Sequence, residues 1–180
     1  MITNFDFQIL DWIAANCRCA ALDVIAPALS FLAEGGIFWI LLGIVLLCIP
    51  KTRKAGLALA IAIVLNLALC NGVVKPLVDR LRPYELRPDI LLIVSEPIGP
   101  SFPSGHTSAS FSCAGALLFA KNRLGVPTLI LAALIGLSRL YLYVHFPTDV
   151  IAGALLGLLC GFWGTILEKK WAEFRQKRKS

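Results

Sequence analysis

The stretch AGLALAIAIVLNLALCNGVV, residues 55–74, carries no charged side chain. Its length matches the ~20 apolar residues that a helix needs to cross the hydrocarbon core of a bilayer. Another apolar run precedes it at residues 36–49, and three follow it at residues 104–120, 126–144 and 148–167. Of the 180 residues, 58% are hydrophobic and only 16% are charged, unlike a water-soluble domain. The sequence therefore predicts an all-α, polytopic membrane helix bundle, with one domain over residues 1–180.

The segment before these runs, residues 1–33, fits more than one arrangement. Its beginning has the pattern of an amphipathic helix at the membrane interface, with apolar residues Phe5, Ile9, Trp12 and Ile13. The following apolar run, residues 24–33, gives only ~15 Å of helix. Either a tilted first span kinked at Pro27 or a re-entrant piece fits this length. Near the other end of the chain, Gly153, Gly157 and Gly161 recur every four residues and predict a close-packing helix face.

The net charge of +6 comes from basic residues that cluster beside the apolar runs. The clusters are KTRK at 51–54, KNR at 121–123 and the C-terminal KKWAEFRQKRKS. Such clusters are typical of cytoplasmic flanks that contact anionic lipid, so the predicted partner is the bilayer and not nucleic acid. With these clusters on the cytoplasmic side, residues 76–103 and 145–149 must both lie on the opposite face.

The six cysteines do not form the pattern of a disulfide framework. Four of them lie within apolar runs, where cysteine behaves as a small hydrophobic residue. Cys17 and Cys19 form a C-x-C motif without a matching pair of ligands elsewhere in the chain. The sequence therefore predicts neither a metal site nor any other cofactor.

Three polar patches stand out on the predicted extracytoplasmic side: KPLVDRLRP at 75–83, PSGH at 103–106 and SRLYLYVHFPTD at 138–149. Taken singly, most of their residues have ordinary explanations. Lys75 and Arg82 fit basic residues that extend from a span end to the interface, and Ser104 fits a helix N-cap. Arg139 is harder to explain, because it lies inside a span where a charge is expensive and usually functional.

Together the patches supply what a phosphate group in a membrane-face pocket requires. Lys75, Arg82 and Arg139 provide positive charge, and the Ser104–Gly105 backbone at a helix N-terminus provides N–H donors. His145 and Asp149 are separated by a proline turn that permits the carboxylate to hold one imidazole nitrogen and leave the other free to attack phosphorus. His106 would then protonate the departing oxygen.

The order and spacing of these residues resemble the signature of the type 2 phosphatidic acid phosphatase superfamily. The matching elements are Lys75-x6-Arg82-Pro83, then Pro103-Ser104-Gly105-His106, then Ser138-Arg139-x5-His145-x3-Asp149. The resemblance implies about six transmembrane helices and a metal-independent lipid phosphatase. It also implies that His145 is the nucleophile, Asp149 its orienting partner and His106 the general acid. Phosphate would be bound by Lys75, Arg82, Ser104, Gly105 and Arg139.

Among lipid phosphates, the small size and the external site favour undecaprenyl diphosphate. Phosphatidylglycerophosphate, phosphatidate and transfer of the phosphoryl group to another lipid stay open as alternatives. A non-catalytic membrane transporter or anchor is a further alternative, with the buried charges lining an ion or lipid path. The spacing of residues gives no oligomeric state. The resemblance favours a bacterial-type plasma membrane as the location.

Overall fold

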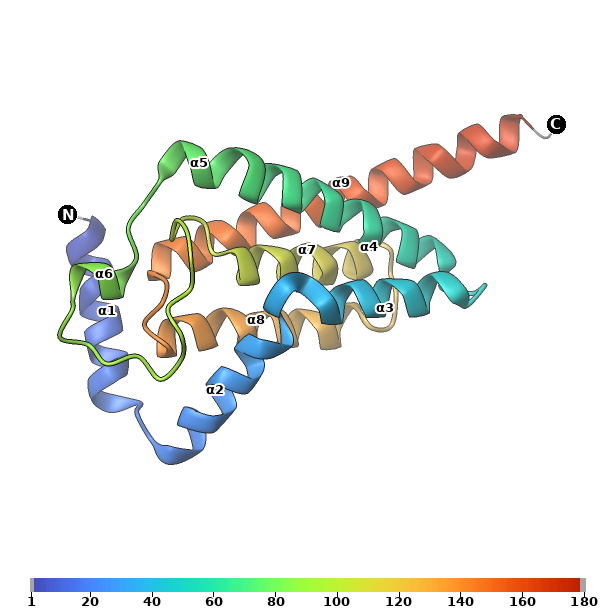
Figure 1. The fold of residues 1–180 in the computed structure, drawn as a ribbon. Coiled ribbons are helices and arrows are strands. Elements are labelled where there is room, and N and C mark those ends of the chain that lie inside the picture. Colours follow the sequence, from blue (N-terminus) through green and yellow to red (C-terminus); the bar gives the residue numbers. More distant parts are fainter. Residues whose placement is uncertain (1, 179–180) are drawn as a thin grey trace.

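The computed structural model describes residues 2–178, and every regular element among them is helical (Figure 1). The elements are α1 (Ile2–Asn16), α2 (Ala20–Leu32), η1 (Glu34–Gly36), α3 (Ile37–Cys48), α4 (Arg53–Asn66), η2 (Leu67–Val74), α5 (Lys75–Val78), α6 (Pro83–Leu86), α7 (Gly105–Phe119), α8 (Gly125–Tyr141) and α9 (Pro147–Lys177). The all-α prediction is thus confirmed for the described part of the chain.

The predicted count of about six membrane-spanning helices is not confirmed by helix length and hydropathy alone, and it stays a prediction. Within residues 2–178, two stretches are long and apolar enough to cross a bilayer, Arg53–Leu86 and Pro147–Lys177. A third candidate pairs α2 with η1–α3, bent by 43° at their junction. The break lies at Gly35 and Gly36, whose φ angles of 59° and 70° suit glycine, and not at Pro27, which lies inside α2.

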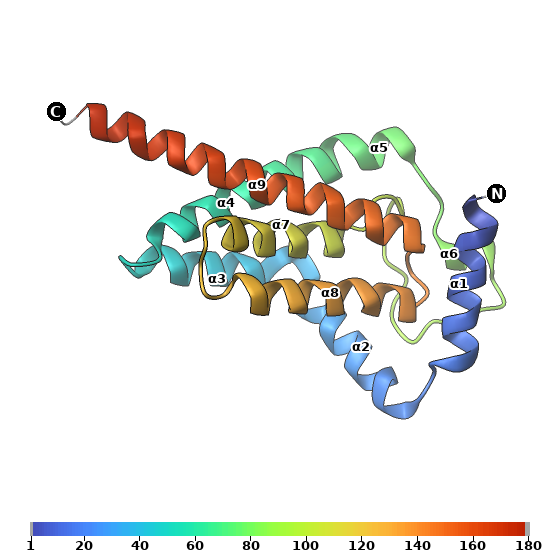
Figure 2. The same cartoon turned by 180° about the vertical axis from the view of Figure 1, so that it is seen from behind.

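The core of the bundle is built around α7. Figures 1 and 2 show this helix in the middle, with α9, α8 and α4 beside it. Trp39, Leu59, Leu117 and Ile135 form one buried cluster that joins α3, α4, α7 and α8. The outer faces keep large apolar side chains exposed, such as Leu155 on α9. An apolar exterior over an apolar core is the arrangement that a lipid surround requires.

The predicted glycine face of α9 packs directly against α7. A methyl group added at Gly157 would lie 2.4 Å from the carbonyl oxygen of Ser108, and one added at Gly161 would lie 2.6 Å from the amide nitrogen of Ala116. Both distances are far below van der Waals contact. The two backbones approach this closely only because the α9 residues lack side chains, which confirms the close-packing prediction.

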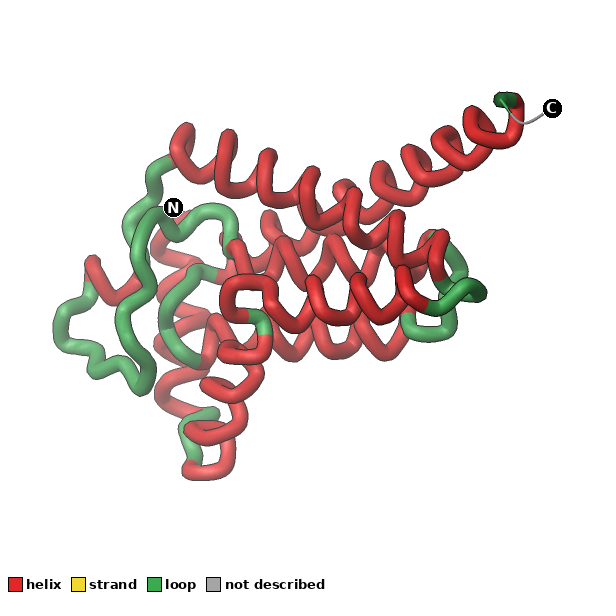
Figure 3. Tube along the Cα trace, turned by 45° about the vertical axis from the view of Figure 1, so that its right-hand side comes forward, coloured by secondary structure: helices red, strands yellow, loops and turns green. Residues whose placement is uncertain are grey.

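The two segments with unusual polar content meet at one end of the bundle (Figures 1 and 3). The long connection between α6 and α7 and the short turn between α8 and α9 lie there, and α1 runs across the same end. The α3–α4 turn, the α7–α8 turn and the end of α9 lie at the opposite end. The prediction that both loops share one side, away from the basic clusters, agrees with this arrangement.

Candidate active site

A cavity of about 630 Å³ opens at this end of the bundle. It brings together six of the predicted site residues, and only Ser104 and Asp149 lie behind its wall. Five separate segments contribute to the lining. The predicted residues that line it are Lys75, Arg82, Gly105, His106, Arg139 and His145.

Helix ends place these side chains. The α4 helix widens into the π-helical segment η2 directly before Lys75, and one further turn follows despite Pro76. Asp79 then adopts a left-handed conformation, with a φ of 43°, and redirects the chain toward Arg82. Arg139 occupies the last turn of α8. A basic residue at a helix C-terminus is favourably placed for the helix dipole.

The start of α7 is held by Ser104, which is buried. Its Oγ accepts hydrogen bonds from the Thr107 amide at 3.4 Å and the Thr107 hydroxyl at 2.9 Å, so the side chain is an N-cap. Its own backbone N–H donates to the carbonyl oxygen of Asp149 at 3.0 Å. That N–H was expected to face an anion, but it is used to join α7 to α9. The residues at the N-terminus of α7 that line the cavity are therefore Gly105 and His106.

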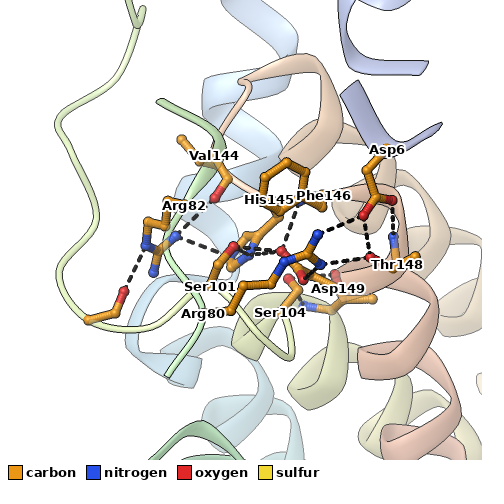
Figure 4. Close-up of polar contacts among 12 residues, drawn as sticks. Asp6, Arg80, Arg82, Ser101, Ser104, Val144, His145, Phe146, Thr148 and Asp149 are labelled. Atoms are coloured by element: carbon orange, nitrogen blue, oxygen red, sulfur yellow. Dashed lines mark hydrogen bonds and ion pairs between the residues drawn. The ribbon is translucent and has the colours of Figure 1, made fainter. Parts of the chain in front are cut away.

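His145 has a distinct partner on each ring nitrogen (Figure 4). Arg82 Nη1 lies 3.3 Å from Nε2 and also donates to the Val144 carbonyl at 3.1 Å. Because a guanidinium has only donors, Nε2 must accept and the ring proton lies on Nδ1. Nδ1 is 3.3 Å from Ser101 Oγ and 3.6 Å from Asp149 Oδ2. The unprotonated nitrogen is therefore the one beside the arginine of the cavity.

The surroundings of His145 also keep the ring neutral. Burial lowers the pKa of His145 to about 3, and the nearby Arg139 and Arg82 guanidinium groups add to this effect while the Asp149 carboxylate opposes it. A neutral imidazole retains the lone pair that a nucleophile needs.

Asp149 is fully buried and accepts three hydrogen bonds. Its Oδ2 receives the Ser101 hydroxyl at 2.5 Å and the Phe146 amide at 2.9 Å, while its Oδ1 receives Arg80 Nη1 at 2.6 Å. The predicted contact with His145 is therefore made mainly across Ser101. Sequence reasoning missed Ser101 and Arg80, although both lie within or beside stretches that had been singled out.

His106 also has a carboxylate partner that the sequence did not indicate. Its Nε2 lies 3.1 Å from Glu34 Oε2, on the η1 turn between α2 and α3. Glu34 lines the same cavity. Both histidines thus face one space, each supported by polar groups from distant parts of the chain.

Arg139 contributes a third basic side chain to the cavity lining. It is buried, and its Nη1 donates to the Ser30 hydroxyl. Among the residues described, its Nε has no hydrogen-bond partner. A buried guanidinium nitrogen without a partner costs free energy.

The described side chains offer no evident set of metal ligands. In the part of the chain that is described, no group of three or more His, Cys, Asp or Glu side chains gathers as metal ligands do. The cavity lining contains three basic side chains, Lys75, Arg82 and Arg139, beside the carboxyl groups of Glu34 and Glu96. The three basic side chains form a donor set that suits an anion.

These features define a class: a helical membrane protein with a cationic cavity at one end of its bundle and a neutral histidine inside it. The model of the PAP2 superfamily matches residues 54–173. The chain belongs to this superfamily, which confirms the resemblance carried by the three polar patches.

Individual relatives carry different names. The bacitracin transport permease protein BcrC of Bacillus licheniformis is 31% identical over 146 residues, covering 78% of this chain and 72% of the relative. The undecaprenyl-diphosphatase of Sulfolobus acidocaldarius is 35% identical over 131 residues, covering 72% of this chain and 63% of the relative. The crystal structure of the transmembrane PAP2 type phosphatidylglycerolphosphate phosphatase of Bacillus subtilis matches with a TM-score of 0.77 and 26% identity, over 94% of this chain and 87% of that chain.

Proposed function

We propose that the protein is a membrane lipid phosphatase that removes a terminal phosphate through a phosphohistidine intermediate. The observation that carries this proposal is the His145 Nε2 atom, unprotonated and beside Arg82, in a cavity that also contains Lys75 and Arg139. The proposed substrate is undecaprenyl diphosphate, converted to undecaprenyl phosphate. The relative named undecaprenyl-diphosphatase supports this choice of lipid.

The reaction proceeds in two steps. In the first, Nε2 of His145 attacks the terminal phosphorus, the bond to the bridging oxygen breaks and His106 gives a proton to that oxygen. In the second, His106 takes a proton from water, the hydroxide attacks the phosphohistidine and the P–N bond breaks. Inorganic phosphate leaves, and both histidines regain their starting states. Asp149, through Ser101, stabilises the positive ring that exists between the steps.

Charge on the transferred phosphoryl group is balanced by Lys75, Arg82 and Arg139, with the N-terminus of α7 at Gly105. Three fixed cations do the work that a divalent metal does in other phosphatases. The proposed mechanism is therefore metal-independent and requires no cofactor.

A lipid substrate is supported by the apolar residues at the cavity mouth. Phe31 and Ile98 line the cavity and expose 79% and 98% of their surface. Large exposed apolar side chains next to a cationic site suit a molecule with a charged head and a hydrocarbon tail. A water-soluble phosphate ester would make no use of them.

Two other functions have specific support. The structural similarity to a phosphatidylglycerolphosphate phosphatase favours a glycerophospholipid substrate at the same site. The relative named as a transport permease favours a membrane transporter whose buried charges line a path. The transporter function, unlike the phosphatase functions, does not require a covalent intermediate on His145.

The proposed setting is a bacterial-type plasma membrane, with about six spans, an interfacial α1 and the site on the extracytoplasmic face. The exposed Phe5 and Trp12 of α1 support an interfacial position. The basic clusters at the far end of the bundle support the orientation. The whole chain, residues 1–180, is proposed to act as one domain.

The deciding experiment measures phosphate release by the purified protein in detergent, with undecaprenyl diphosphate, phosphatidate and phosphatidylglycerophosphate. We expect His145→Ala and His106→Ala each to lose several orders of magnitude while eluting as folded protein in size exclusion. Terminally labelled substrate and an alkaline quench should trap label on the wild type and none on His145→Ala. Full activity in His145→Ala would remove the nucleophile role.

A further inference from the structure

We infer that Asp6, on α1, is a positioning residue for the nucleophile, acting through Arg80 and Asp149. The inference rests on the proposed role of His145. Asp6 lies outside the three polar patches and outside the cavity lining, and no step of the reaction above uses it. Its carboxylate is nevertheless fully buried within the polar cluster behind the active site (Figure 4).

The contacts of Asp6 link three elements. Its Oδ2 accepts from Arg80 Nη2 at 2.7 Å and from the Thr148 hydroxyl at 2.7 Å, and its Oδ1 accepts from the Thr148 amide at 3.1 Å. Thr148 lies in the first turn of α9, where backbone N–H groups have no partner within the helix. Asp6 therefore caps α9 from outside while it also binds Arg80.

Arg80 is held on three sides. One guanidinium nitrogen binds Asp6, the other binds Asp149 Oδ1 at 2.6 Å, and the guanidinium carbon lies 3.9 Å from the ring centroid of Phe146. A planar fork that binds two carboxylates and stacks on a ring has one allowed position. Asp149 is thereby fixed where its other oxygen receives Ser101, the residue that contacts His145.

The charge of this cluster favours the reaction. Two carboxylates share one guanidinium, so the group Asp6, Arg80 and Asp149 has one negative charge in excess. Attack by Nε2 makes the His145 ring positive, and the excess negative charge behind it stabilises that state. If Asp6 were neutral, Arg80 would pair with Asp149 alone and the excess would vanish. The loss would fall on the chemical step and not on substrate binding.

The same helix provides a matched control. Asp11 also joins α1 to the rest of the protein, accepting from the Tyr143 hydroxyl at 2.6 Å and from Arg87 Nη2 at 3.4 Å. Neither partner contacts Asp149. Asp11→Asn therefore removes a polar contact of α1 without changing the charge behind His145.

The test compares kcat and KM for lipid phosphate release by the full chain and three variants. We expect Asp6→Asn to lower kcat about 10-fold or more with KM within about twofold, Asp6→Glu to recover part of the loss, and Asp11→Asn to stay near wild type. The rate at which labelled phosphohistidine forms should fall with kcat.

Three results would overturn the inference. They are wild-type kcat in Asp6→Asn, equal losses in Asp6→Asn and Asp11→Asn, and a change confined to KM. In each case an inactive His145→Ala leaves the proposed function in place. An active His145→Ala would instead remove both, since the cluster would then have no nucleophile to support.

Discussion

His145 carries its proton on Nδ1 because the two ring nitrogens have different hydrogen-bond partners. Arg82 donates toward Nε2, and Ser101 with Asp149 receives the other nitrogen. A ring fixed in one tautomer needs no rearrangement before it attacks. At the scale of single residues, the site is prepared by hydrogen bonds that exist before any substrate arrives.

The low pKa of His145 makes protein stability depend on pH. In the unfolded chain the imidazole titrates near 6.5, as free histidine does, whereas in the folded protein its pKa is about 3. Between these values the unfolded state binds the proton and the folded state does not, so stability falls as the pH drops from about 6.5 toward 3. The Tm in detergent should decline over this window, and less steeply in His145→Gln. Identical slopes would contradict the buried neutral ring.

Chelators should leave phosphate release unchanged. Lys75, Arg82 and Arg139 already supply fixed positive charge in the cavity, so removal of divalent ions takes nothing from the proposed transition state. The measurement is kcat/KM before and after dialysis against EDTA. Activity that is lost and returns with added magnesium or zinc would contradict the proposed mechanism.

Most of the residues that sequence reasoning identified lie close to the ends of apolar runs, whereas Arg139 lies inside one. Lys75, His106 and Arg139 could be placed on one side from the runs alone. Sequence reasoning missed four residues of the site, because their hydrogen-bond partners depend on the paths of the loops and on how α1 packs. These residues are Asp6, Glu34, Arg80 and Ser101. Aspartate on an amphipathic helix has the same appearance in sequence whether it faces water or a buried arginine, so no periodicity separates the two.

At the scale of elements, α7 and α9 form the most extensive contact of the bundle. Their backbones meet along the glycine face, and the first turn of α7 is joined to α9 by the Ser104–Asp149 hydrogen bond. This contact between α7 and α9, called the seam below, therefore aligns the helix that carries His106 with the helix that carries Asp149. This seam was predictable from the glycine spacing, whereas the bend at Gly35 and Gly36 was not, because Pro27 gave the stronger local signal.

Gly157→Ala should test the seam. The added methyl group would lie 2.4 Å from the Ser108 carbonyl, so the helices must separate, at a cost of about 1–3 kcal/mol. We expect a lower Tm in detergent and reduced phosphate release. Gly72→Ala is the matched control, because a methyl group there has no neighbour within 4 Å in the described structure. Equal Tm values for the two variants would contradict the seam.

At the scale of the whole molecule, one end of the bundle carries the cavity and the other carries the basic clusters. The native cysteines report on both ends. Cys19 is exposed next to the site end, where its backbone amide lies 3.3 Å from the Tyr141 hydroxyl, and Cys48 is exposed at the end of α3 before the KTRK cluster. The positive-inside rule predicts that they lie on opposite sides of the membrane.

Labelling of intact cells should distinguish the two ends. In single-cysteine variants, a membrane-impermeant maleimide is expected to modify Cys19 in intact cells and to reach Cys48 only after lysis. The reverse pattern would put the cavity in the cytoplasm. Reagents applied to detergent-solubilised protein should modify both, which controls for thiol reactivity.

The contact between Asp6 and the first turn of α9 also has a consequence for biosynthesis. Asp6 is translated early, but Arg80, Thr148 and Asp149 emerge from the ribosome much later. Before those residues are made, the Asp6 carboxylate lacks these hydrogen-bond partners. We therefore expect α1 to stay in contact with water at the membrane interface while the spans are inserted. The site end of the bundle can therefore be completed only after Thr148 and Asp149 have been made, and a polypeptide that stops before them would release no phosphate from the lipid around it.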